Sequence, residues 1–205
     1  MMIALEKMKT SKDRIQEARN SEELLGVEGD TSHSYFSVFD DMILKNKNEF
    51  KFDSRNRRPP LDPVNAMLSY VYTLLYHDMI SALECVGLDP AVGFMHRDRP
   101  GRLSLALDLA EEFRSFFADR LVLSLINRNE VTPEQFEKTA SGAVNMDEAA
   151  RKTVITAYQK KKETVLQHPY VEKRMHLAIL FHTQARLLAR HIRGDIDGYP
   201  VYLWK

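Results

Sequence analysis

The stretch that decides the fold class is VNAMLSYVYTLLYHDMISALECV, residues 64–86. It is long and heavily apolar, which predicts a buried helix. Asp62 and Pro63 come directly before it, and they supply a helix cap followed by proline in the first turn. Gly87 comes directly after it and is typical of the position where a helix ends. The centre of the chain is therefore expected to be a helix with both ends defined.

Helical patterns continue on both sides of this segment. Asn20, with Glu23 three residues later, predicts the cap of a helix that enters the stretch up to residue 44. Thr132 and Pro133 predict the start of a short helix. Strand-like alternation is limited to residues 50–52 and 199–204. The remaining helical patterns cover residues 103–127, 145–167 and 170–194. The sequence therefore predicts an all-α fold.

Formal charge cancels over the 205 residues, with 29 basic and 29 acidic side chains, so the total charge gives no signature of polyanion binding. The distribution is uneven. Residues 1–53 carry 8 basic and 11 acidic side chains, whereas residues 147–205 carry 11 and 6. This asymmetry suits a protein that binds a metal in one place and phosphate in another, and ordinary solvated helix faces are the alternative.

The cysteine count bears on the compartment. A single cysteine, Cys85, excludes an intramolecular disulfide and is expected to be a buried small hydrophobe. The sequence contains no apolar run long enough to span a membrane, and its first 20 residues do not resemble a signal peptide. We therefore expect a cytoplasmic protein without a membrane segment.

The candidate metal-ligating residues are concentrated in GFMHRDRPGRLSLALDLAEEFRS, residues 93–115. On a helix, Asp108, Glu111 and Glu112 fall along one flank at spacings that bring side chains together. Like charges repel unless a cation or a proton relieves them, which suggests a metal. His96, at a turn 12 residues before Asp108, can supply a nitrogen ligand, and such a mixed set suits Mn²⁺ or Mg²⁺. The alternative is a solvated acidic flank paired with Arg102, Arg114 or Ser115.

Arginines are candidates for contacts with a phosphate backbone. They lie in the polar loop 45–63, in the turn after His96, and at helical spacing near the end of the chain. The candidates are Arg57, Arg58, Arg97, Arg99, Arg102, Arg186, Arg190 and Arg193. Gly26 and Gly29 are unusual inside a helix, and they suggest close backbone packing or a ligand beside Glu28.

Four ordered blocks resemble the C-terminal catalytic domain of the CRISPR-associated adaptation integrases, the "Cas-one" family, and are similar to its type I-C branch. The blocks are LLGVEGDTSHSYF (24–36), RNRRPPLDPVNAMLSYVYTLL (55–75), GLDPAVGFMHRDRPGRLSLALDLAEEFR (87–114) and QARLLARHIRGDIDGYPVYLW (184–204). The resemblance implies an α-helical metal-dependent catalytic domain over residues 21–205, preceded by a connecting or N-terminal helical segment over residues 1–20.

The same resemblance implies roles for single residues. Glu28, His96 and Glu111 would hold the metal, with Asp108 as a supporting acid nearby. Glu112 leaves an ambiguity of one residue at the third ligand. Asn65 also matches a position of the family, and its expected role is to form hydrogen bonds that position helices around the site.

The implied activity is cleavage and joining of DNA, in which the 3′-hydroxyl of a short foreign DNA attacks a phosphodiester at a repeat boundary. The implied partners are double-stranded and branched DNA, a second copy of the chain, and the small adaptation partner protein. Family members normally begin with a β-rich domain, which these residues lack, so we expect the assembly to differ.

Two other functions fit parts of the sequence. His77 and Asp78 resemble the dyad of helical metal phosphohydrolases, which could borrow His33 and a further aspartate. A helical DNA-binding or scaffold module, inactive without an N-terminal domain, is the non-enzymatic alternative. The sequence contains no G-x-x-x-x-G-K-[ST] loop and no G-x-G-x-x-G, which removes the usual nucleotide-binding motifs.

Overall fold

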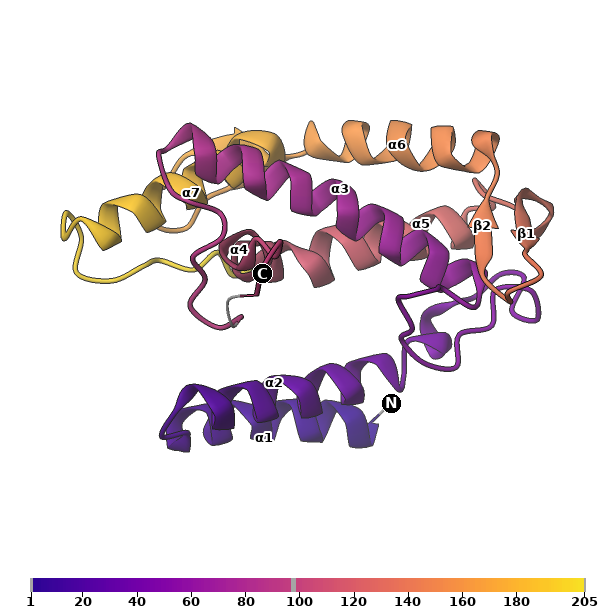
Figure 1. Ribbon diagram of the computed structural model, residues 1–205, viewed down its shortest axis with the longest axis horizontal. Coiled ribbons are helices and arrows are strands. Elements are labelled where there is room, and N and C mark those ends of the chain that lie inside the picture. The colour runs from indigo at the N-terminus through magenta and orange to yellow at the C-terminus, as the bar shows by residue number, and fades with distance from the viewer. Residues whose placement is uncertain (1, 97–98, 205) are drawn as a thin grey trace. The chain divides into compact units, whose positions relative to one another are not determined.

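The computed structural model describes residues 2–96 and 99–204, and most of them are helical (Figure 1), which confirms the all-α fold class. The α-helices are α1 (Met2–Glu17), α2 (Ser21–Phe36), α3 (Pro63–Cys85), α4 (Ser104–Phe113), α5 (Arg120–Asn127), α6 (Glu148–Lys162) and α7 (Leu177–Ile192). Short 3₁₀-helices are η1 (Asp40–Met42) and η3 (Pro133–Gln135), and η2 (Arg114–Asp119) is a π-helix.

The chain divides into two compact units. The first unit contains the residues up to Met67 together with Leu123–Ala150. The second unit contains Leu68–Val122 together with the residues from Arg151 onward. Among the described residues, no helix is both long enough and apolar enough to cross a membrane.

In the first unit, α1 and α2 lie side by side (Figure 1). A guanidinium nitrogen of Arg14 lies 2.9 Å from a carboxylate oxygen of Asp30, which joins the two helices at their surface. The predicted cap of α2 is confirmed, because the side chain of Asn20 accepts a hydrogen bond of 2.9 Å from the amide of Glu23. The helix stops at Phe36, short of the predicted residue 44.

The two glycines of α2 do not pack closely within the described structure. A Cβ atom built on Gly26 or on Gly29 would meet no described heavy atom within 4 Å. Close backbone packing, the first of the two expectations, is therefore wrong for the described residues, whereas a ligand beside Glu28 stays a prediction.

Aromatic side chains form the core of the first unit. The rings of Phe36, Phe39 and Phe52 lie within 6 Å of one another, and Phe50 packs edge-on against Phe136 at 5.6 Å. Phe50 and Phe52 are buried, yet the segment 50–52 that holds them is irregular and forms no strand. Its alternation therefore reflects burial of two rings rather than membership of a sheet.

Two small antiparallel hairpins interrupt the helices. The strands β1 (Phe136–Lys138) and β2 (Val144–Met146) pair in the first unit, and β3 (Val165–Gln167) and β4 (Arg174–His176) pair in the second. The predicted helix 145–167 therefore ends too late, since α6 (Glu148–Lys162) stops before β3. The predicted helix 170–194 begins too early, since α7 (Leu177–Ile192) starts after β4. Buried His168 supplies the reason, because its Nδ1 accepts hydrogen bonds from the amides of Tyr170 and Val171 and so stabilises the turn.

Helix α3 provides the core of the second unit, where Leu75, Met79 and Leu83 are fully buried. This confirms the predicted buried helix, whose cap Asp62 accepts a 2.8 Å hydrogen bond from the amide of Asn65. Cys85, at the end of α3, is exposed, so its predicted burial is wrong. The last turn of α3 reaches the surface there, which the apolar neighbours of Cys85 in the sequence do not reveal.

The segment after α7 forms no strand, contrary to its alternating pattern. It packs through its rings instead. Tyr202 stacks on Phe113 with ring centroids 6.3 Å apart, and Trp204 stacks on Phe116 at 5.9 Å. The chain end is thereby fixed to α4 and η2.

Candidate active site

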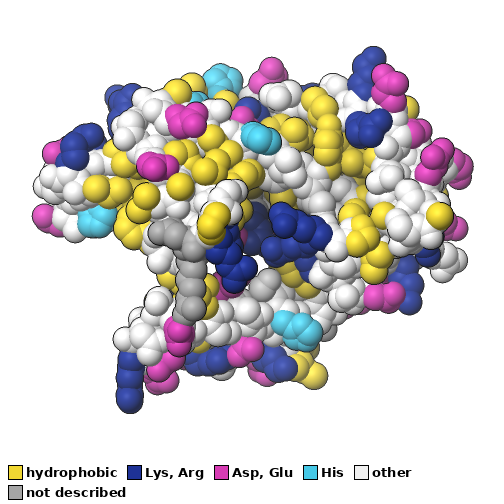
Figure 2. Space-filling model, viewed as in Figure 1, with side chains coloured by type: hydrophobic (Ala, Val, Ile, Leu, Met, Phe, Trp, Pro, Cys, Tyr) yellow, Lys and Arg dark blue, Asp and Glu magenta, His cyan; other side chains and the backbone are white. Residues whose placement is uncertain are grey.

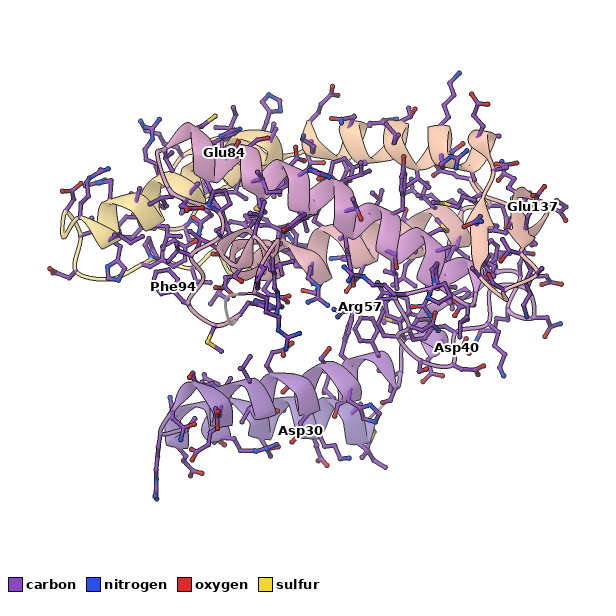
Figure 3. All side chains as sticks on the ribbon, in the orientation of Figure 1. Asp30, Asp40, Arg57, Glu84, Phe94 and Glu137 are labelled. Atoms are coloured by element: carbon purple, nitrogen blue, oxygen red, sulfur yellow. The ribbon has the colours of Figure 1, made fainter. Side chains whose placement is uncertain are left out.

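Asp108 holds the turn that carries His96. Its carboxylate accepts hydrogen bonds from the backbone amides of Phe94 at 2.6 Å, Met95 at 3.1 Å and His96 at 3.1 Å. Figure 3 labels Phe94 in this turn. Burial acts to raise the pKa of Asp108, but the hydrogen bonds from the His96 ring and from these amides outweigh it, so the pKa lies below its ordinary value. Asp108 is therefore an anionic anchor on α4.

The imidazole of His96 is oriented by the same carboxylate. Its Nδ1 lies 2.6 Å from Oδ1 of Asp108. Because an ionised carboxylate only accepts hydrogen bonds, we assign the proton to Nδ1, which leaves Nε2 with a lone pair. A histidine oriented through one nitrogen in this way is the usual form of a metal-ligating imidazole.

The turn approaches α4 closely only because residue 93 is glycine. A Cβ atom at Gly93 would lie 2.6 Å from Cβ of Ser104 and 2.9 Å from Oδ2 of Asp108, closer than such atoms pack. The sequence alone did not predict this role of Gly93. The signal available was the glycine three residues before the histidine, but its contacts depend on the fold.

Two neighbouring glutamates on α4 face different groups. Glu111 is exposed and forms an ion pair with Arg114, as the solvated-flank alternative anticipated. Glu112 is largely buried and binds the chain end, where it accepts hydrogen bonds from the hydroxyl of Tyr199, the amide of Tyr202 at 2.8 Å and the side chain of Gln184 at 2.7 Å. Burial raises the pKa of Glu112, with the hydrogen bonds opposing it. The carboxylate of Glu112 is thus held by hydrogen bonds to α7 and the segment after it, whereas the side chain of Glu111 is exposed to solvent.

Glu28 belongs to the first unit, on α2, and its side chain is exposed. His96, Asp108 and Glu111 belong to the second unit. Among the described residues, no three His, Cys, Asp or Glu side chains are gathered as a group that could hold a metal ion.

Asn65 organises the loop that carries Arg57 and Arg58. Its buried side chain donates to the carbonyl of Ser54 at 2.8 Å and to Asp62 at 2.6 Å, and it accepts a hydrogen bond from the amide of Asn56 at 3.1 Å. Both arginines project from this loop as exposed side chains, and Figure 3 labels Arg57. Asn65 therefore shapes a basic loop directly before α3.

The other arginine candidates lie in the second unit. Arg99 is exposed and Arg102 half-buried in the connection before α4, whereas Arg97 lies outside the described residues. Figure 2 shows basic side chains on the surface with acidic ones among them. Arg186 and Arg190 on α7, and Arg193 directly after it, are all exposed.

One of these three arginines, the one after the end of α7, is already paired. The guanidinium of Arg193 lies 2.9 Å from a carboxylate oxygen of Asp195, which partly neutralises it. Arg186 and Arg190 are therefore the stronger candidates for phosphate contacts on this helix.

The alternative dyad His77–Asp78 does not have the form of a metal site. Asp78 accepts a 2.6 Å hydrogen bond from the hydroxyl of Tyr158 through one oxygen and binds the ammonium of Lys162 at 2.8 Å through the other. His77 is exposed. Both oxygens of Asp78 thus join α3 to α6, which argues for a structural role.

The described residues thus form a helical protein in which Asp108 fixes His96, and exposed Glu111 lies on the same helix as Asp108. Comparison with known proteins identifies its family. The family model described as "CRISPR associated protein Cas1" matches residues 1–160. The chain belongs to this family, as the sequence resemblance predicted.

A protein from Chlorobaculum tepidum named "CRISPR-associated endonuclease Cas1 1" is 56% identical over 192 residues, which are 94% of this chain and 56% of that protein. The chain thus spans little more than half the length of this relative.

Two solved structures share the fold. A casposase bound to integration product matches with a TM-score of 0.84 at 24% identity, covering 98% of this chain and 60% of the casposase chain. A partial Cas6-RT-Cas1–Cas2 complex matches with a TM-score of 0.82 at 24% identity, covering 98% of this chain and 59% of that one.

Proposed function

We propose that this chain carries the catalytic residues of a metal-dependent DNA endonuclease and integrase of CRISPR adaptation, which inserts short foreign DNA into a repeat array. The observation that carries the proposal is the 2.6 Å contact between His96 Nδ1 and Asp108 Oδ1, on the same helix as an accessible Glu111. Membership of the Cas1 family and a relative named an endonuclease support the assignment.

The donor set fits a divalent cation such as Mn²⁺ or Mg²⁺. His96 offers Nε2 because Asp108 engages its other nitrogen, and Glu111 offers a carboxylate at the surface of α4. Glu28, exposed on α2, is proposed as the third ligand from the family resemblance. One imidazole and two carboxylates match the mixed nitrogen and oxygen preference of Mn²⁺, and Mg²⁺ accepts the carboxylates. When bound, such an ion would neutralise charge on a phosphodiester.

The proposed reaction exchanges one phosphodiester for another. The 3′-hydroxyl oxygen of the incoming DNA bonds to phosphorus, the bond from phosphorus to the 3′-oxygen of the repeat strand breaks, and a proton passes from the attacking to the leaving oxygen through solvent. Asp108 keeps the His96 proton on Nδ1 throughout, and the arginines carry the counter-charge that aligned DNA backbones require. These are Arg57, Arg58, Arg97, Arg99, Arg102, Arg186, Arg190 and Arg193.

The partners follow from the same proposal. We infer that the chain binds double-stranded and branched DNA in the cytoplasm, and that a longer protein containing it forms a homodimer and binds a Cas2-like partner. One structural neighbour is described as bound to integration product and another as a Cas1–Cas2 complex, which supports DNA and a Cas2-like protein as partners.

Nicking of branched DNA in the presence of Mn²⁺ tests the function. The native chain is expected to nick, and His96→Ala, Glu28→Ala and Glu111→Ala are each expected to abolish nicking while DNA binding persists. His77→Ala is the matched control, because His77 is an exposed histidine outside the proposed site. Binding without nicking by the native chain would instead support the non-enzymatic DNA-binding module.

A further inference from the structure

Arg114 contacts Glu111 at the point where α4 gives way to a π-helix. It is the first residue of the π-helix η2, which follows α4 directly. Its guanidinium Nη1 donates to Oε1 of Glu111, three residues earlier. The Arg114 side chain is only 18% exposed, whereas that of Glu111 is 41% exposed. A buried arginine is rare unless it is paired, so the ion pair with Glu111 accounts for the burial of Arg114. Short π-helical segments also recur at functional sites.

Two further residues, Tyr72 and Asp119, interact with the guanidinium of Arg114. The Cζ atom of Arg114 lies 4.9 Å from the centre of the Tyr72 ring, and the Tyr72 hydroxyl donates to buried Asp119. Burial acts to lower the pKa of Arg114, but Glu111, Tyr72 and Asp119 together raise it above its ordinary value. Arg114 therefore stays positively charged, and its guanidinium lies against the Tyr72 ring.

The hydrogen bonds of Arg114 are not those that would give the folded protein the greatest stability. The Nε atom of Arg114 is buried and has no hydrogen-bond partner among the described residues. A buried donor left unpaired destabilises the folded state. The guanidinium thus gives up a hydrogen bond at Nε while it engages Glu111 through Nη1, which points to a role for the Glu111 contact beyond packing.

We propose that Arg114 is a positioning residue for Glu111. It binds Oε1 and fixes the carboxylate in one orientation, and no other hydrogen bond of the Glu111 side chain occurs in the described part of the chain. Oε2 is thereby presented for a divalent cation. The inference rests on the proposed function, because it takes Glu111 as a ligand. Hydrogen bonds to a ligating carboxylate set its direction and strengthen metal binding.

The sign of the effect follows from the charges around Arg114. A lone guanidinium would repel a cation and weaken its binding. Buried Asp119 is among the groups that raise the pKa of Arg114, so it offsets part of the positive charge of the guanidinium. We expect the orientation of the carboxylate to dominate, so that loss of Arg114 weakens metal binding.

Mn²⁺ binding to the full chain without DNA tests this, followed by calorimetry and by the electron paramagnetic resonance signal of free Mn²⁺. Arg114→Gln is expected to weaken Mn²⁺ binding about 10- to 100-fold, the range for lost hydrogen bonds to metal ligands. Arg114→Lys is expected to bind more tightly than Arg114→Gln but more weakly than the native chain, because an ammonium lacks the planar fork.

Tyr72→Phe is the matched control for a purely structural effect. It removes the hydroxyl that binds Asp119 but keeps the ring under Arg114 and leaves Glu111 untouched. It is expected to lower the thermal unfolding midpoint while Mn²⁺ affinity stays native. Equal losses of affinity in Tyr72→Phe and Arg114→Gln would overturn the proposal, as would native affinity in Arg114→Gln.

Two further outcomes are decisive. If Arg114→Gln does not fold, Arg114→Lys settles the question, because native Mn²⁺ affinity in that variant contradicts a positioning role. If native binding is unaffected by both His96→Ala and Glu111→Ala, the proposed function itself fails, and this inference fails with it.

Discussion

The Nδ1 atom of His96 lies 2.6 Å from Oδ1 of Asp108, and the same carboxylate accepts hydrogen bonds from the backbone amides of residues 94, 95 and 96. One side chain on α4 thus fixes both the backbone of the turn and the ring at its end. The geometry of His96 therefore depends on Asp108 more than on its own neighbours in sequence.

Asp108→Asn is expected to weaken Mn²⁺ binding about 10- to 100-fold, because His96 loses the acceptor that fixes its ring. The amide also places a donor against backbone N–H groups, which is expected to cost about 1–3 kcal/mol of unfolding free energy. Calorimetric titration with Mn²⁺ and urea unfolding measure the two effects. Native Mn²⁺ affinity in this variant would show that His96 needs no second partner.

Gly93→Ala is expected to destabilise the turn by about 1–3 kcal/mol, the usual cost of inserting a methyl group into a packed site. The new Cβ would lie 2.6 Å from Cβ of Ser104. Hydrogen exchange at the amides of Phe94 and Met95 reports the change directly, since both bind Asp108. Faster exchange is expected, and unchanged protection would mean that the turn accommodates a side chain.

Gly26→Ala is the matched control in an open position. No described heavy atom lies within 4 Å of the Cβ it would create, and Gly26 is inside helix α2. The substitution is therefore expected to stabilise the helix by about 0.5–1 kcal/mol. A rise in the unfolding midpoint checks it. Destabilisation would indicate packing that the described residues do not account for.

Sequence patterns predicted the local features well. The caps at Asn20 and Asp62 and the buried helix that begins at Pro63 depend on residues close together in the chain, and all three are confirmed. The hairpin β3–β4 was missed because its residues continue helical patterns on both sides. Its turn depends on His168, whose Nε2 also contacts the side chain of Gln184 at 2.8 Å, 16 residues away.

The candidate site residues could be named from the sequence, but their contacts could not. Residues 96, 108 and 111 were identified from spacing and resemblance, whereas the spacing alone left Glu111 and Glu112 equivalent. The partners that separate them lie far away in sequence, because Tyr199 and Tyr202 bind Glu112 from 87 and 90 residues away. Arg114 was foreseen only as a surface partner, since its burial depends on Tyr72 and η2.

Glu112 predicts a pH dependence of stability. Its folded pKa is raised above the ordinary 4.5 by burial, against its hydrogen bonds. The folded protein thus holds this proton to higher pH than the unfolded chain does. The contribution of Glu112 to unfolding free energy is full below the unfolded pKa and is lost as pH rises through the folded pKa.

Urea unfolding of the native chain and of Glu112→Gln between pH 4.5 and pH 7.5, a range that begins at the ordinary pKa, measures this contribution. The native chain is expected to lose stability relative to the variant as pH rises, because glutamine does not titrate. A stability difference that stays constant over this range would contradict the raised pKa.

Charge reversal on α7 is expected to weaken DNA binding. The double variant Arg186→Glu, Arg190→Glu removes two exposed cations, and each lost phosphate contact should reduce the slope of log affinity against log salt by about 0.9. Lys160→Glu, Lys161→Glu on α6 makes the same charge change at exposed positions as a control. Equal weakening by both pairs would show a general charge effect without a specific track.

We propose that Glu28, His96 and Glu111 hold one divalent cation. A crystal structure of the chain with Mn²⁺, located by anomalous scattering, tests this proposal. We expect one Mn²⁺ ion bound by Nε2 of His96 and by carboxylate oxygens of Glu28 and Glu111, with Glu112 still on Tyr199. Mn²⁺ bound by Glu112 or by His77, or absent from His96 at saturating concentration, would contradict it.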